Sequence, residues 1–131
     1  VIQCLQERKG IPVYGTGENI RDWLFVQDHV LALYEIATNG VKNESYNIGS
    51  SNELSNISII HYICSIYDQL VGIQNSKDLI SFVKDRPGHD FRYSIDASKL
   101  IHDTAWRPKS SFETALSQTV EWYLQNPTYL K

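Results

Sequence analysis

The sequence of 131 residues contains no methionine, and its only two cysteines, Cys4 and Cys64, do not form a CxxC pair. Isolated cysteines of this kind indicate reduced thiols and argue against a disulfide framework or a metal site, so we expect a cytoplasmic protein. There is no basic block and the net charge is −3, which argues against nucleic-acid binding. No apolar run approaches membrane-spanning length, and the run at 23–26 has only four residues.

The first ten residues have the pattern of the last turns of a helix. Apolar residues stand at positions 1, 2 and 5, basic residues follow at 8 and 9, and Gly10 comes directly after them. No capping residue precedes this helix, and the chain has no initiator methionine. We therefore expect residues 1–131 to be the C-terminal region of a longer protein. The alternative is a trimmed start on a complete small domain.

Hydrophobic periodicity predicts an α/β fold with about four helices and a few short strands. The expected strands span residues 11–14, 45–48, 79–83 and 92–95, and the expected helices span 26–39, 56–71 and 97–104. A capping box at Ser110-Ser111-Phe112-Glu113 predicts a last helix that ends at Asn126-Pro127. The first long helix has one apolar stripe that should face the core: Val26, Val30, Leu33 and Ala37. Strand partners for a full parallel sheet are missing, which fits part of a larger protein.

Two arginine-bearing segments stand out: Arg21-Asp22-Trp23 after a glycine-rich turn, and Asp85-Arg86-Pro87-Gly88-His89-Asp90. A guanidinium group is a planar, permanently charged fork that matches two phosphate oxygens at once. Two such groups on separate loops predict a clamp for a diphosphate, and hence a phosphorylated small molecule as ligand. The alternative is that each arginine pairs with its neighbouring aspartate on the surface.

Four further residues are candidates for the same ligand. His89 shares a loop with Arg86 and could donate another hydrogen bond to phosphate, and Asn56 at a helix start could add an amide and a positive helix end. Tyr14 and Pro12, beside the glycine turn, could pack on a nucleobase or could equally be edge-strand packing residues.

No catalytic constellation is visible in the sequence. Gly15-Thr16-Gly17 is not a dinucleotide fingerprint, because Ile20 stands at the third glycine position and no helix is expected to open at this turn. Signatures of the GxSxG, HExxH and CxxC types are absent, and no tyrosine has a lysine four residues later. We therefore predict no catalytic, cofactor-binding or metal-binding residue in this segment.

The motifs together resemble the C-terminal half of dTDP-glucose 4,6-dehydratases, members of the extended short-chain dehydrogenase/reductase superfamily. The resemblance covers nearly the whole chain in order, and its most specific part is the Asp85–Asp90 segment. The matching segments are Pro12–Leu24, Val26-x-Asp28-His29, Tyr46–Gly49, Asn52-Glu53 with Asn56, Asp85–Asp90, Arg92-Tyr93, Asp96–Lys99, Trp106-x-Pro108 and Phe112-Glu113.

The resemblance implies a larger enzyme with two regions. An N-terminal NAD(P)-binding Rossmann-type region would hold NAD and the catalytic residues, and the present region would close over dTDP-glucose. In the family the product is the 4-keto-6-deoxy sugar nucleotide, formed by oxidation, loss of water and reduction, and the enzymes are commonly homodimers. On this basis Arg21, Asn56 and Arg86 look like diphosphate ligands, His89 looks like an accessory contact, and Pro12 and Tyr14 look like neighbours of the thymine.

The sequence departs from the family pattern in two places, and two alternative functions stay open. Phe91 stands where the family usually has a basic residue, and Thr104-Ala105 replaces the usual Leu-Gly. The first alternative is a related epimerase or decarboxylase that acts on UDP-sugars. The second is a non-catalytic module that keeps only the nucleotide-sugar clamp. In the leading interpretation this segment alone is inactive, because the cofactor fingerprint and the acid/base residues lie outside it.

Overall fold

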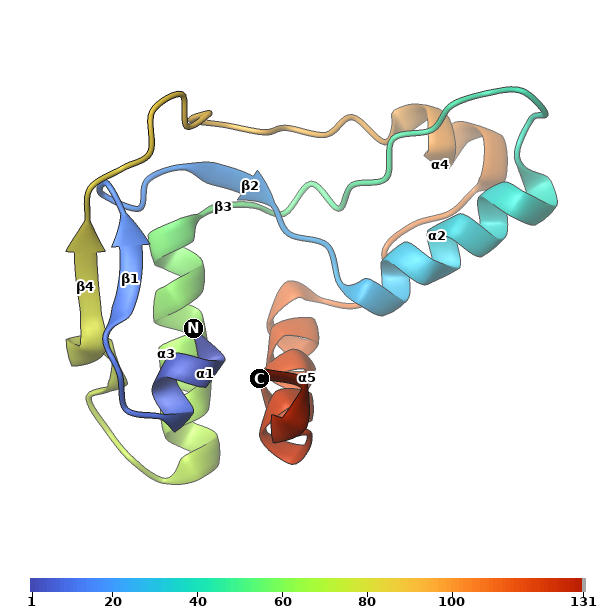
Figure 1. The fold of residues 1–131 in the computed structure, drawn as a ribbon. Helices are drawn as coiled ribbons and strands as arrows, with labels where there is room; N and C mark the ends of the chain where they lie inside the picture. The colour runs from blue at the N-terminus through green and yellow to red at the C-terminus, as the bar shows by residue number, and fades with distance from the viewer. Residues whose placement is uncertain (131) are drawn as a thin grey trace.

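Two groups of elements lie at opposite ends of the molecule and are joined by extended segments (Figure 1). The structure is a computed structural model that describes residues 1–130. The first group contains α1 (Ile2–Gln6), β1 (Ile11–Tyr14), α3 (Asn56–Val71), η1 (Ser76–Leu79), β4 (Ile80–Val83), α5 (Phe112–Gln125) and η2 (Pro127–Leu130). The second group contains α2 (Val26–Asn39) and α4 (Ser98–Thr104), and the short strands β2 (Ile20–Asp22) and β3 (Glu53–Ser55) lie between the groups.

The main core lies between a two-stranded parallel sheet and α3. Strand β1 pairs with β4 in the register Ile11↔Ile80, and Ile11 and Val13 are buried. Helix α3 buries one face at helical spacing, which includes Cys64 and Tyr67. Ser55 caps its start by accepting from the Ser58 amide at 3.2 Å. These elements confirm the predicted strand at residues 11–14 and the predicted helix at residues 56–71. Together they support the candidate site.

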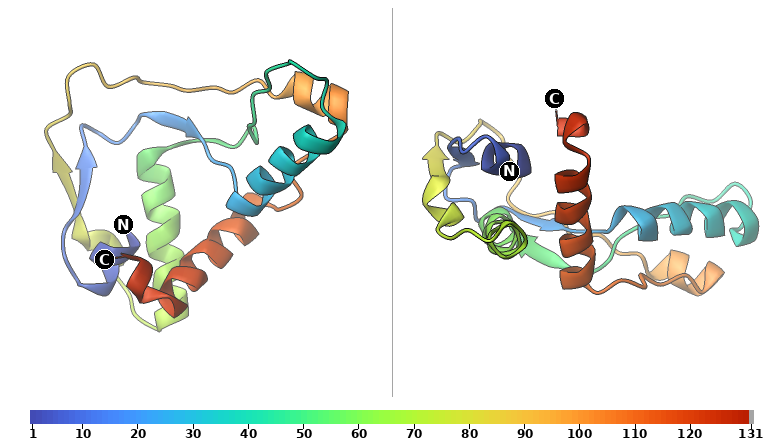
Figure 2. Two further views of the ribbon diagram at one scale, coloured as in Figure 1. Left: turned by 45° about the vertical axis from the view of Figure 1, so that its right-hand side comes forward. Right: turned by 90° about the horizontal axis from the view of Figure 1, so that it is seen from below.

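Helix α5 packs against α3 and completes this core with buried Val120 (Figure 2). The predicted capping box is wrong by one residue. Ser111, not Ser110, caps the helix by accepting from the Thr114 amide at 3.2 Å. The physical reason is that the Ser110 amide donates to the buried Asp28 carboxylate at 3.3 Å, so Ser110 belongs to the preceding loop.

The apolar stripe of α2 does not face a core within the described chain, contrary to the prediction. Val26, Val30 and Leu33 are 65%, 57% and 50% exposed. The opposite side of α2 carries the buried residues, and Ala32 packs there with Leu100 and Trp106 to form a second, smaller core. Helix α4 packs on this side, and residues 1–130 leave the stripe largely exposed.

Two predicted strands are absent from the part of the chain that the structure describes. Residues 45–48 are extended but unpaired, and residues 92–95 make only a single bridge, between Ile20 and Arg92. Alternation gives a segment the capacity to be a strand, but a strand exists only where another backbone satisfies its hydrogen bonds. The short strand β3 was not predicted, and it pairs antiparallel with β2 through Arg21↔Leu54.

Candidate functional site

The glycine turn after β1 fixes the direction of the chain at the site. Gly15 and Gly17 have φ of +57° and +74°, in the left-handed region where a side chain is strained. A Cβ on Gly17 would lie 2.7 Å from Cγ1 of Val13 and 2.9 Å from Cβ of Ile57. The Gly17 carbonyl accepts from the Ile57 amide at 2.9 Å. The turn therefore fastens β1 to the start of α3 and leads into β2, not into a helix.

The two arginine-bearing segments lie side by side, although they are far apart in the sequence. The Ile20 amide donates to the Phe91 carbonyl at 2.7 Å, and the Tyr93 amide donates to the Ile20 carbonyl at 3.1 Å. The buried Asn19 side chain adds a bond to the Asp90 carbonyl at 3.2 Å. Figure 1 shows the resulting arrangement, in which the gold chain beyond β4 runs along β2.

Arg21 is held in one orientation by main-chain oxygens. Its Nη1 donates to the Ile20 carbonyl at 2.6 Å and to the Phe91 carbonyl at 3.4 Å, and its Nη2 donates to the Asp90 carbonyl at 2.9 Å. The guanidinium carbon lies 4.4 Å from the centre of the Tyr93 ring, which is cation–π geometry. All of these acceptors are neutral carbonyl oxygens, so the charge of Arg21 is not neutralised by them.

The alternative that Arg21 pairs with its neighbouring aspartate is wrong. The Asp22 carboxylate accepts from the amide and hydroxyl of Ser50 at 2.9 and 2.6 Å and from the Asn52 amide at 3.1 Å. It therefore organises the loop before β3. Within residues 1–130 Arg21 takes part in no ion pair.

The neighbouring aspartate of Arg86 is likewise engaged elsewhere. Asp85 Oδ1 lies 2.8 Å from Nδ1 of His89 and also accepts from the Arg86 amide at 2.8 Å. The hydrogen bond from His89, followed by that from the Arg86 amide, lowers the pKa of Asp85. The His89 side chain is only 7% exposed, whereas the Arg86 side chain is exposed and makes no ion pair among the described residues.

Both guanidinium charges act on one hydroxyl group, that of Tyr93. Tyr93 donates a hydrogen bond to the Asp90 carboxylate, and this bond is the main cause of its raised pKa. The positive charges of Arg21 and Arg86 both act to lower the pKa of this hydroxyl, against the effect of Asp90. The backbone bonds between Ile20 and residues 91 and 93 thus bring the segment that carries Arg86 beside the strand that carries Arg21.

The other three candidate residues line a single pocket. Pro12, Tyr14 and Asn56 border a pocket of about 440 Å³ between β1, the start of α3 and Tyr123 of α5. The Asn56 amide donates to the Asn19 carbonyl at 3.0 Å, so this pocket adjoins the turn that leads to Arg21. The structure thus gathers the six candidates into two adjacent sets. One set, Arg21, Arg86 and His89, is cationic or polar, and the other set borders the pocket.

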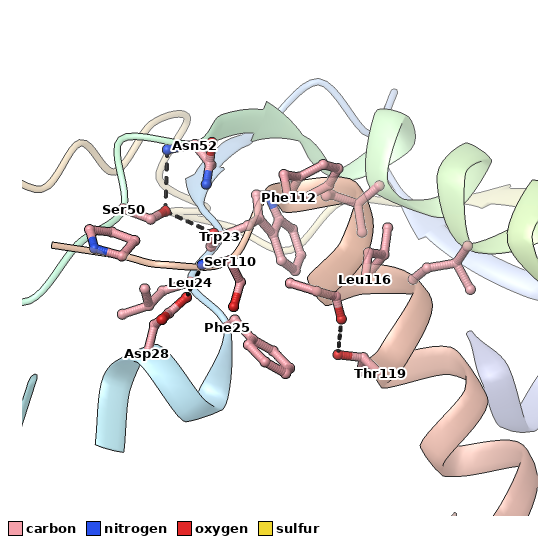
Figure 3. Close-up of a pocket in the computed structure, with 14 residues that line it drawn as sticks. Trp23, Leu24, Phe25, Asp28, Ser50, Asn52, Ser110, Phe112, Leu116 and Thr119 are labelled. Carbon is pink, nitrogen blue, oxygen red and sulfur yellow. Dashed lines mark hydrogen bonds between the residues drawn. The ribbon is translucent and has the colours of Figure 1, made fainter. Parts of the chain in front are cut away.

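A second pocket, of about 220 Å³, lies near the loop between α4 and α5 and holds none of the six candidates (Figure 3). Trp23, Phe112 and Leu116 make its walls largely apolar. Its carboxylate, Asp28, is satisfied by the Lys109 and Ser110 amides. This pocket therefore has no free charged group that could act on a ligand.

Sequence reasoning missed two residues that organise the site, Asn19 and Tyr93. Asn19 follows a glycine turn and Tyr93 follows the arginine-bearing segment, but neither position has a local pattern that predicts its tertiary contacts.

No cluster of metal-ligating side chains occurs among residues 1–130, and no helix described there is long and apolar enough to cross a bilayer.

Comparison with known proteins decides the family. A sequence profile described as GDP-mannose 4,6 dehydratase matches residues 1–119. The chain belongs to this family. Among its relatives, a dTDP-glucose 4,6-dehydratase of Escherichia coli is 54% identical over 123 residues, which are 90% of this chain and 34% of that protein. A dTDP-glucose 4,6-dehydratase of Neisseria meningitidis is 50% identical over 126 residues, which are 92% of this chain and 36% of that protein.

Solved structures of this dehydratase family share the fold. The dTDP-glucose 4,6-dehydratase of Bacillus anthracis, in complex with NAD, superposes with a TM-score of 0.85 and 38% identity over 98% of this chain and 39% of that one. The dTDP-glucose 4,6-dehydratase of Streptomyces venezuelae, with NAD and TYD bound, superposes with a TM-score of 0.84 and 32% identity. This match covers 98% of the present chain and 38% of that one. The similarity to dTDP-glucose 4,6-dehydratases and the extended short-chain dehydrogenase/reductase fold are thus confirmed. The chain spans about a third of the length of the curated relatives it matches.

Proposed function

We propose that this chain is the sugar-nucleotide-binding region of a dTDP-glucose 4,6-dehydratase. The 54% identity to the E. coli enzyme supports this substrate, and the structure supports a binding role for the region. The observation on which the proposal depends is the junction of β2 with the 85–93 segment, which brings the segment that bears Arg86 alongside the strand that bears Arg21. The whole enzyme would be a lyase that converts dTDP-glucose to the 4-keto-6-deoxy sugar nucleotide.

In this proposal Arg21, Arg86 and His89 bind the diphosphate, and Asn56 at the start of α3 adds its side-chain amide. A charge-assisted hydrogen bond to phosphate contributes about 1.5–3 kcal/mol, whereas a surface Asp–Arg pair contributes about 0–1 kcal/mol. Among residues 1–130 neither arginine forms an ion pair with an aspartate, so no such pair has to break before the ligand binds.

Pro12 and Tyr14 are proposed to contact the thymine. Both are exposed on β1 at the edge of the same pocket as Asn56, so a base packed there could leave its diphosphate near β2. The tyrosine ring offers a flat apolar face to a base, which suits stacking.

The residues described here do not fit NAD. The glycine turn leads into β2 and not into a helix, so the positive helix end that holds a dinucleotide pyrophosphate is absent at this turn. We place the NAD site and the acid/base residues in the part of the relatives that this chain does not match. The exposed stripe of α2 and the unpaired segment 45–48 support such a further region, because both would gain partners from it. The homodimeric state and the cytoplasmic location stay predictions.

The function is tested by exchanging segments. We expect a chimera, in which this chain replaces the matching third of the E. coli dehydratase, to form the keto sugar from dTDP-glucose. The chain alone, incubated with dTDP-glucose and NAD, should form none. Turnover is followed by the absorbance of the keto sugar in alkali. A folded but inactive chimera, or turnover by the isolated chain, would contradict the proposal.

Base preference separates this proposal from a UDP-sugar epimerase or decarboxylase. The chain shares its fold with the UDP-glucose 4-epimerase of Thermotoga maritima, at a TM-score of 0.80 and 23% identity. We expect dTDP to compete with bound dTDP-glucose at a lower concentration than UDP does, measured by displacement from the chimera. Equal competition, or preference for UDP, would favour the epimerase class.

A further inference from the structure

Tyr93, Asp90 and Arg21 form a closed unit beside the proposed diphosphate site. The Tyr93 ring lies against the Arg21 guanidinium, and its hydroxyl donates to the Asp90 carboxylate. The Asp90 carbonyl, in turn, accepts from Nη2 of Arg21 at 2.9 Å. Tyr93 and Asp90 therefore contact the Arg21 guanidinium together, Tyr93 at its face and Asp90 at Nη2.

The hydrogen bonds of Arg21 leave a particular edge of the guanidinium available. Arginine has five N–H donors, one on Nε and two on each Nη. The bonds to the Ile20 and Phe91 carbonyls involve Nη1, and the bond to the Asp90 carbonyl takes one donor of Nη2. The donor of Nε and the second donor of Nη2 have no acceptor among residues 1–130. Nε and Nη2 form one edge of the guanidinium, and an edge of this kind can span two oxygens of one phosphate.

Tyr93 has no evident role in the hydrophobic core. It is 50% exposed and belongs to neither core cluster. Its place in the backbone is held by the bond from its own amide to the Ile20 carbonyl, which any residue except proline would keep. The side chain can therefore be exchanged without removing the link between β2 and the 85–93 segment.

We infer that Tyr93, fixed by Asp90, is a positioning residue that directs the Nε–Nη2 edge of Arg21 toward a phosphate of the nucleotide. This inference rests on the proposed function and adds to it the means by which one guanidinium is oriented before the ligand arrives. An orientation set in advance lowers the ordering cost of binding. The resulting gain in affinity should appear only for ligands that carry a phosphate.

The test compares three variants of the chain. Tyr93→Leu removes the ring, Tyr93→Phe keeps the ring and loses the bond to Asp90, and Phe82→Leu alters an aromatic side chain that is 61% exposed on β4. From the strength of cation–π contacts we expect Tyr93→Leu to weaken dTDP binding about tenfold and Tyr93→Phe about threefold. Thymidine, which has no phosphate, should bind all variants equally, and Phe82→Leu should match the parent for both ligands.

Calorimetric titration gives these affinities for the isolated chain, and the same variants in the E. coli chimera give a second measurement. There Tyr93→Leu should raise KM for dTDP-glucose about tenfold and leave kcat unchanged. An equal loss for dTDP and thymidine would make Tyr93 a structural residue only, and no loss for dTDP would remove its role. Either result overturns the inference.

A readout without ligand separates this inference from the proposed function. The Arg21 Nε–H resonance of the parent should show the upfield ring-current shift of a stacked guanidinium, and Tyr93→Leu should abolish that shift. If the shift is present but the parent binds no dTDP, the proposed function fails and the orientation of Arg21 stands. If the shift is absent in the parent, Tyr93 does not hold Arg21 and the inference is wrong.

Discussion

Replacement of Arg86 by alanine is expected to weaken dTDP binding about 10- to 100-fold. The Arg86 side chain is exposed and has no ion-pair partner among residues 1–130, so the substitution leaves no internal group unsatisfied. The loss corresponds to one charge-assisted hydrogen bond of about 1.5–3 kcal/mol. Calorimetric titration of the chain with dTDP measures it, and in the chimera the change should appear in KM for dTDP-glucose.

Arg92→Ala is the matched control for this prediction. Arg92 lies in the same segment, but its guanidinium is already paired with Glu53, at 2.7 Å from both Nε and Nη2. We expect this variant to bind dTDP within about twofold of the parent, since an exposed pair contributes about 0–1 kcal/mol to stability and none of it to the ligand. Equal losses for both variants would mean that general positive charge, not a specific clamp, attracts the nucleotide.

Gly17→Ala is expected to lower the free energy of unfolding by about 3 kcal/mol. The left-handed φ of +74° costs a side chain about 1–2 kcal/mol. The new Cβ would also meet Val13 and Ile57 at 2.7 and 2.9 Å, and such overpacking costs about 1–3 kcal/mol. Neither neighbour can move easily, because Val13 is buried in β1 and Ile57 stands in the first turn of α3.

Gly72→Ala separates the two causes of this loss. Gly72 has the same φ of +74°, but nothing lies within 4 Å of the position its Cβ would take. This variant should lose only about 1 kcal/mol, the conformational part. Urea denaturation of both variants gives the comparison. If Gly17→Ala were no more destabilising than Gly72→Ala, the close junction of the turn with α3 would not be present in solution.

The sequence predicts those parts of the fold whose partners are close by. Helices α3 and α5 bury the apolar faces that their spacing indicates, and both begin at serine caps. Prediction failed where residues 1–130 supply no partner. The stripe on α2 is apolar yet exposed, and residues 45–48 alternate like a strand yet find no neighbouring backbone.

The sequence predicts candidate ligating residues, whose role stays a prediction, but it does not predict the residues that support them. Arg21 and Arg86 could be recognised because a guanidinium beside turn residues indicates phosphate chemistry. The proximity of the two segments that carry them depends on bonds between Ile20 and the 91–93 backbone, for which no local pattern exists. The engagement of Asp22 and Asp85 with other groups is also a tertiary effect that spacing alone could not reveal. Among residues 1–130 it leaves both arginines without an ion pair.

The most direct measurement is a crystal structure of the chimera with dTDP bound. The account predicts that the Nε–Nη2 edge of Arg21 contacts one phosphate, that Arg86 contacts the diphosphate from the other segment, and that the thymine lies beside Tyr14. A diphosphate bound elsewhere, with both arginines directed into solvent, would contradict it.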